Sequence, residues 1–203
     1  MPTPPATPPL PPAPRSVEET GINIAFLADL VLKTMYTRGF LMGHEIAAAV
    51  RLPFANVIDK VLDHLRREHL TEVKGSSGFG ESSYQYVISD EGRARAREVM
   101  EQSQYVGPAP VTLEAYNKMI LDNSLKAHTV TEAKMRRALS HLVISETILA
   151  SLGPAVNSGK SIFLFGEAGN GKTVIADAMG NMMPGAILIP YAINVDGHVI
   201  KVF

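Results

Sequence analysis

The sequence predicts an α+β domain followed by the beginning of an α/β domain, on two observations. Residues 21–104 show three helical apolar patterns, two short strand patterns and a further helical pattern. Closer to the C-terminal end, an apolar strand pattern, a glycine-rich loop and another helical pattern follow one another, as they do in α/β domains. With 46% apolar and 19% charged residues in 203, the chain has enough apolar content for one or two compact cores.

Composition excludes several classes of function. A net charge of −1 gives the chain no general attraction to nucleic acid or to an anionic membrane surface. The absence of cysteine excludes disulfides, thiolate metal sites and cysteine nucleophiles, and the six histidines lack the spacing of a helical metal pair. No apolar run reaches the length of a membrane span, and the N-terminus has no signal-peptide pattern. We therefore expect a cytoplasmic protein with no membrane partner.

Residues 1–15 are a proline-rich tract with a lone Leu10. Proline cannot donate the hydrogen bonds of a helix, and the tract lacks the side chains that a core needs. We expect a disordered tail that acts as a tether. A ligand for domains that recognise proline-rich peptides is the alternative.

Three helices are expected next. The first carries apolar residues at helical spacing and ends at Gly39. A short helix over His44–Arg51 and a tight turn then lead into a third helix over Pro53–Glu68, which has a wide apolar face.

A hairpin and a fourth helix complete this part of the chain. Leu70–Lys74 and Tyr84–Ser89 have strand patterns, and the loop between them is rich in Gly and Ser. Asp90 is the expected cap of a helix over Glu91–Gln104.

This order of three helices, a two-stranded wing and a further helix resembles a winged helix-turn-helix domain. The resemblance covers residues 21–104, and we place the domain at 16–104. In that family the third helix often reads DNA, and the wing, here Ser76–Ser83, often contacts backbone phosphates.

The charges of this domain favour another role. Residues 16–104 hold thirteen acidic against ten basic residues, and the wing has no cation and one acid, Glu81. We favour docking of a protein partner or a structural role in an assembly. Sequence-specific DNA binding is the alternative.

Residues 105–111 are rich in Gly and Pro and predict a linker into a second domain over residues 112–203. Helical patterns follow over Thr112–Leu125 and Thr131–Leu152. Within the second pattern, Ser145 can cap a separate helix.

The strongest functional signal is a run of eight residues that matches GxxxxGK[ST], the phosphate-binding loop of P-loop proteins. An apolar strand over Ile162–Phe165 is expected before the run. A helix that continues from Val174 is expected after it. The run consists of Gly166, Glu167, Ala168, Gly169, Asn170, Gly171, Lys172 and Thr173. The motif in this setting predicts that the chain binds ATP or GTP.

The chemistry of a polyphosphate explains the residue types. Several N–H donors must converge on its oxygens, and glycines allow the unusual dihedral angles that this requires. We expect Lys172, the one catalytic candidate, to contact the β and γ phosphates, and the Thr173 hydroxyl to bind Mg²⁺. The amides of residues 166–173 and of Val174, at the start of the helix, complete the expected nucleotide site.

Two further strand patterns follow the expected helix. Ala186–Pro190 is an apolar run that predicts a second strand. Ile193–Phe203 predicts a hairpin with a two-residue turn at Asp196 and Gly197.

Residues from about Leu113 to Phe203 resemble the start of an AAA+ ATPase module, similar to bacterial ATPases of the MoxR-like or chaperone-type group. The fold class is then a winged helix followed by the beginning of an α/β P-loop NTPase domain. The resemblance implies ATP and Mg²⁺ as cofactors, a ring-shaped homo-oligomer and remodelling of a protein partner. It also implies an adenine contact at Leu142, Val143 and Ile144, for which three core residues of a buried turn are the alternative.

The sequence departs from that family after the glycine-rich run. Hydrolysis requires an acidic pair after a later strand, a polar sensor and an arginine from a neighbouring subunit, and none is visible. Asp196 is a poor candidate for the metal-holding acid because Gly197 makes a turn there. We expect a fragment of a longer ATPase. The alternatives are a winged-helix transcription regulator or DNA-acting ATPase, and a protein of another P-loop branch such as a kinase.

Overall fold

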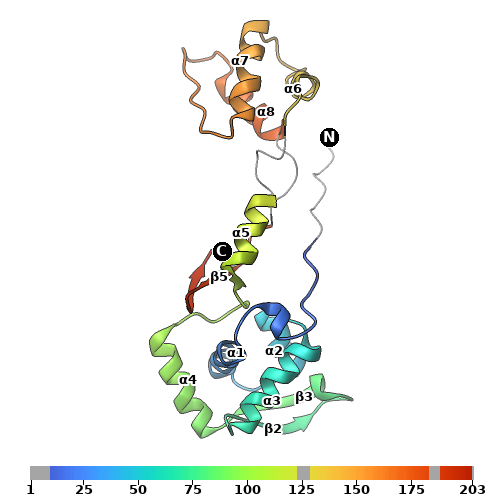
Figure 1. Cartoon of the computed structure of the whole chain (residues 1–203), viewed down its shortest axis with the longest axis vertical. Coiled ribbons are helices and arrows are strands. Elements are labelled where there is room, and N and C mark those ends of the chain that lie inside the picture. The colour runs from blue at the N-terminus through green and yellow to red at the C-terminus, as the bar shows by residue number, and fades with distance from the viewer. Residues whose placement is uncertain (1–9, 123–128, 183–187, 203) are drawn as a thin grey trace. The chain divides into compact units, whose positions relative to one another are not determined.

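The computed structural model describes residues 10–122, 129–182 and 188–202 (Figure 1). These residues form an α+β fold with eight α-helices and two three-stranded sheets. Contacts divide the chain into two compact units, one over residues 10–117 and 189–202 and the other over 118–188. None of the described helices has the length and apolar character that crossing a membrane requires.

The first unit is built around helix α1 (Ile24–Arg38). The Asn23 side chain accepts a hydrogen bond from the Ala25 amide at 2.8 Å and begins the helix, and Gly39, at φ +86°, ends it as predicted. The middle of α1 is buried all round, because helices α2, α3 and α4 and strand β3 surround it. Its buried apolar residues are Leu27, Ala28, Leu30, Val31, Leu32 and Met35.

The predicted second and third helices are confirmed. Helix α2 (Gly43–Val50) is followed by a tight turn, a short helical turn η2 (Phe54–Ile58) and helix α3 (Asp59–Arg67). Within η2 the backbone leaves the helical region, with Asn56 at φ +63°, so the expected helix over Pro53–Glu68 begins with a kink.

The first sheet has the order β1-β3-β2 and is antiparallel throughout. Strands β2 (Thr71–Ser76) and β3 (Tyr84–Ile88) form the predicted hairpin, and the short β1 (Leu41–Met42) is an addition that the sequence pattern did not show. The ring of Tyr86 is buried in the core beneath the sheet, and this burial raises the pKa of its hydroxyl to about 12.

Helix α4 (Asp90–Gln102) begins one residue earlier than predicted. Its cap is Ser89, whose hydroxyl oxygen accepts a hydrogen bond from the Gly92 amide at 3.0 Å, so the prediction that Asp90 caps the helix was wrong. The Ser89 hydroxyl also donates to the carbonyl of His69 at 2.7 Å. One side chain thus begins the helix and holds it against the end of α3.

A second sheet belongs to the same unit. Strands β5 (Ala192–Val195) and β6 (His198–Lys201) form the predicted hairpin, and its turn has Asp196 at φ +50° and Gly197 at φ +83°. Strand β4 (Val111–Thr112) pairs with β5 in parallel. The sequence predicts one domain over residues 112–203, whereas these contacts place residues 189–202 with the N-terminal unit.

The second unit is helical. It contains part of α5 (Leu113–Asp122) and the whole of α6 (Glu132–Ala138), α7 (Glu146–Asn157) and α8 (Lys172–Met182). Ser145 caps α7 as predicted, accepting a hydrogen bond from the Ile148 amide at 3.4 Å. The helix runs on through Pro154 to Asn157, beyond the expected end at Leu152.

One expected strand is absent from the described residues, and another lies partly outside them. Ile162–Phe165 is not part of any sheet in the described residues, so the prediction of a strand there was wrong. The expected strand Ala186–Pro190 lies partly outside the described residues, and its described part, residues 188–190, has no regular structure.

A close approach at Gly92 provides a test of the N-terminal unit. A Cβ atom there would lie 2.1 Å from the Leu70 carbonyl oxygen and 2.8 Å from Ile88 Cγ1. We therefore expect Gly92→Ala to lower the free energy of unfolding in urea by about 1–3 kcal/mol. Gly75→Ala, whose Cβ would meet its nearest neighbour at 3.7 Å, is the control. Equal stability of the two variants would refute this packing.

Candidate functional site

The eight residues 166–173, called the glycine loop below, precede and begin helix α8. Gly166, Gly169 and Gly171 have φ values of +143°, +85° and +68°. A Cβ atom at any of the three would meet nothing within 4 Å. Glycine is therefore required by the backbone conformation, which residues with a side chain rarely adopt, and not by lack of space.

The side chain of Lys172 turns back into the loop. Its Nζ donates hydrogen bonds to the carbonyl oxygens of Gly166 at 2.9 Å and Glu167 at 2.5 Å. These bonds join the two ends of the glycine loop, since Lys172 is the first residue of α8. They also hold the ammonium group, the one cation among residues 166–173, against the backbone at the start of the loop.

The start of α8 adds backbone donors. The first helical hydrogen bond runs from the Ile175 amide to the Gly171 carbonyl at 2.9 Å. The amides of Lys172, Thr173 and Val174 precede it and have no carbonyl within the helix to bind. Together with the helix dipole, they favour an anion at this end.

Helix α8 is fixed by the core of its unit. Ala178, Met179 and Met182 are buried and pack with apolar residues of α6, α7 and the segment before α6. Met182 is fully buried in this core, and Met183, for which the sequence suggests the same role, lies outside the described residues. The other buried members of this core are Val130, Met135, Leu139, Leu149, Leu152 and Val156.

Two polar contacts hold the surrounding helices together. The Asn157 side chain accepts from the Val130 amide at 2.8 Å and donates to the Val130 carbonyl at 3.0 Å. Arg136 donates to Glu146 at 2.7 and 2.9 Å and to Glu132 at 2.9 Å, and these bonds raise the pKa of Arg136. Sequence analysis missed both contacts. Asn157 and Val130 are 27 residues apart, so no local pattern points to their pairing.

The segment that enters the glycine loop is exposed. The side chains of Phe163 and Phe165 are 85% and 83% exposed, and their rings stack with centroids 6.1 Å apart. Within the described part of the chain, the loop is thus supported from the side of α8 and not by a sheet.

The three residues of the expected adenine contact differ in their burial. Leu142 and Ile144 are partly buried against the core of α6, α7 and α8, as the alternative interpretation predicted. Val143 between them is fully exposed. Leu142 and Ile144 therefore serve the core, and only Val143 presents a free apolar side chain.

The acidic residues near the motif form no metal site of their own. Asp177 is exposed on α8, and Asp196 occupies the turn between β5 and β6. The described residues contain no group of three or more His, Asp or Glu side chains that could hold a metal ion. The exposed Thr173 hydroxyl fits a Mg²⁺ ion as one oxygen ligand, with the others coming from phosphate and water.

The contact of Asn157 with Val130 gives a prediction for the support of the loop. Asn157→Ala removes both hydrogen bonds, so we expect the protection of α7 amides against hydrogen exchange to fall about tenfold. Thr147→Ala, at an exposed position in the first turn of α7, should leave it unchanged. Equal protection in both variants would show that the contact does not hold these helices.

Comparison of the chain with protein-family models, with curated proteins and with solved structures finds no match. The residues and geometry of the glycine loop are therefore the basis for a functional proposal. Three left-handed glycines, an inward-turned lysine and the N-terminus of a helix of 11 residues are its components.

Proposed function

We propose that this chain binds ATP together with Mg²⁺ at the glycine loop. One observation carries the proposal: the GxxxxGK[ST] residues form a loop closed around the Lys172 ammonium, at the N-terminus of α8. ATP is preferred over GTP because the sequence contains no Asn/Thr-Lys-x-Asp signal for guanine.

Different groups of the loop are proposed to bind different parts of MgATP. Lys172 exchanges its two carbonyl partners for β and γ phosphate oxygens, which offer the ammonium full negative charge. The amides of the glycine loop and of Val174 bind the remaining phosphate oxygens. The Thr173 hydroxyl would hold a Mg²⁺ ion, which would supply positive charge against the phosphates.

We further propose an activity of the AAA+ ATPase type, in which a homo-oligomer couples nucleotide turnover to remodelling of a protein partner. Hydrolysis requires an acidic pair after a later strand, and in the described residues no such pair follows β5 or β6.

We propose that residues 16–104 are a winged helix that acts as the adaptor for that partner. On α3, Asp63 pairs with Arg66 at 3.6 Å, and the carboxylate of Glu68, just after the helix, lies 3.5 Å from the His64 ring, so acidic groups accompany the cations of this face. The wing over Ser76–Ser83 has no cation and exposes the whole side chain of Phe79. A wing that contacts phosphates needs unpaired cations, and this wing presents one acid and an aromatic ring.

The second candidate is a winged-helix protein that binds duplex DNA. It is favoured by the order of elements, in which α2, a tight turn, α3 and the hairpin β2-β3 follow one another as in DNA-binding domains.

Removing the ammonium tests the nucleotide site. We expect Lys172→Ala to weaken MgATP binding at least about a hundredfold in calorimetry, because the charge closest to the phosphates is lost. Helical content should stay the same. Lys160→Ala, which removes an exposed lysine of the same unit, is the control and should bind like the wild type. Unchanged affinity of the Lys172 variant would refute the site.

A salt series separates the two roles of the N-terminal unit. With random duplex DNA we expect no measurable binding even at about 50 mM salt, where proteins that neutralise several phosphates bind far more tightly. Fluorescence anisotropy of a labelled duplex gives the affinity. Tight binding that falls steeply with added salt would favour the DNA-binding candidate.

A further inference from the structure

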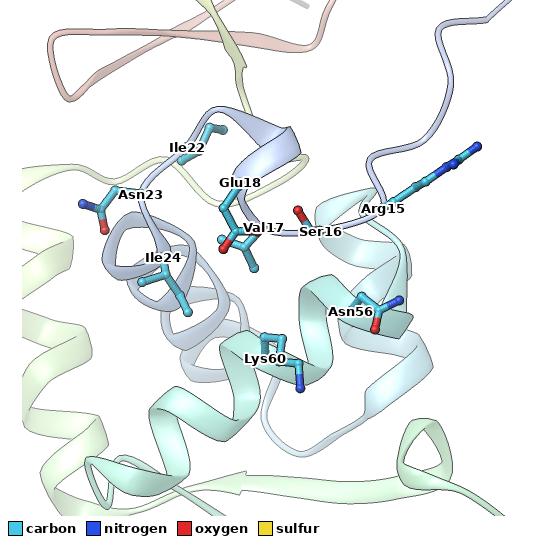
Figure 2. Close-up of a pocket in the computed structure, with 9 residues that line it drawn as sticks. All are labelled: Arg15, Ser16, Val17, Glu18, Ile22, Asn23, Ile24, Asn56 and Lys60. Atoms are coloured by element: carbon cyan, nitrogen blue, oxygen red, sulfur yellow. The ribbon is translucent and has the colours of Figure 1, made fainter.

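The N-terminal unit contains a hollow of about 680 Å³ beside α3 (Figure 2). One wall is the chain from Arg15 to Glu18 together with residues 22–24 at the start of α1. The other wall is formed by Asn56 of η2 and Lys60 of α3. None of the residues that line it belongs to the glycine loop or to the wing.

The floor of the hollow is apolar and fixed. Val17 and Ile22 are buried, and Ile24 packs against the same core as they do. The backbone beneath them is held by the Thr20 hydroxyl, which donates to the Val17 carbonyl at 2.6 Å and accepts from the Ile22 amide at 3.1 Å. The floor is therefore a fixed surface of aliphatic side chains.

The rim of the hollow is cationic in a domain that is acidic overall. Lys60 and Arg15 stand against the single acid Glu18, whereas residues 16–104 hold thirteen acids and ten bases. Neither cation forms an ion pair with another described residue. In Figure 2 Lys60 extends from α3, and Arg15 extends outward from the opposite wall. The two charges are thus available to carboxylates that lie apart from one another.

The rim also offers a group that suits a peptide backbone. The Asn56 side chain is exposed and makes no hydrogen bond within the described residues. An amide side chain carries both donors and an acceptor, so it can bind the N–H and C=O of one peptide unit.

We propose that this hollow binds an acidic peptide segment of the partner protein, with an aliphatic side chain on the floor of Val17, Ile22 and Ile24. Carboxylates of the segment lie at Lys60 and Arg15, and its backbone bonds to Asn56. The proposal rests on the adaptor role of the winged helix and is independent of the glycine loop.

Duplex DNA fits the same hollow poorly. Its phosphates are closely and regularly spaced, so a backbone that crosses the rim would also approach the Glu18 carboxylate. The pKa of Glu18 is lowered by a hydrogen bond from the Ser16 side chain, which keeps this acid ionised. The apolar floor would face a charged sugar-phosphate chain and gain nothing.

The test uses amide spectra of the ¹⁵N-labelled full chain. The probe is a capped octapeptide of Asp and Glu with one central Leu, and a peptide with Gly in place of Leu is its control. We expect saturable shifts at Ile22, Ile24, Asn56 and Lys60, with an affinity in the range of about 0.1–1 mM. The Gly peptide should bind more weakly.

A variant with both Arg15→Glu and Lys60→Glu should bind the Leu peptide at least about tenfold more weakly, because two attractions become repulsions. The control variant reverses two exposed cations elsewhere in the unit, Lys74→Glu and Arg97→Glu, and has the same net charge. It should bind like the wild type.

Absence of saturable shifts in the wild type would overturn the proposal, whether or not the variants fold. So would shifts of these amides by duplex DNA in place of the peptide. Failure of the nucleotide proposal is seen separately, because the Arg15 and Lys60 double variant should keep wild-type MgATP affinity and Lys172→Ala should keep peptide binding.

Discussion

The proposed nucleotide site depends on a backbone that passes through three left-handed positions within six residues. Residues with a Cβ atom avoid such φ values, so Gly166, Gly169 and Gly171 are what allow the loop to close. Once it is closed, the carbonyls of Gly166 and Glu167 come within hydrogen-bond reach of the Lys172 ammonium. The charge, the helix N-terminus and the free amides then lie at one place, and for this reason we propose that the loop binds several phosphate oxygens.

Features set by local chemistry were predictable from the sequence. Apolar periodicity predicted helices α1, α2 and α8, and end signals predicted that α1 ends at Gly39 and that Ser145 caps α7. These features depend on residues that are neighbours in the sequence. The turn at Asp196 and Gly197 is also local, since two residues with positive φ suffice to join β5 and β6.

Features set by distant partners were not predictable. The pairing of β4 with β5 joins segments about eighty residues apart in the sequence. Because of it, the hairpin β5-β6 belongs to the N-terminal unit and not to the domain expected over residues 112–203. The apolar run Ile162–Phe165 has the composition of a strand, but a strand also needs a neighbour, and the described residues supply none. Ser89, and not Asp90, caps α4, and its hydroxyl also donates to the His69 carbonyl. Residues 69 and 89 are far apart in the sequence, so no local pattern indicates this contact.

The central claim is that the amides of the glycine loop bind phosphate, and amide spectra of the ¹⁵N-labelled chain with added MgATP test it most directly. The account predicts that the largest shifts fall on Gly169, Gly171, Lys172 and Thr173, and that α1 and α3 are unaffected. Spectra of a folded sample that stay unchanged at these four amides at saturating MgATP would contradict it.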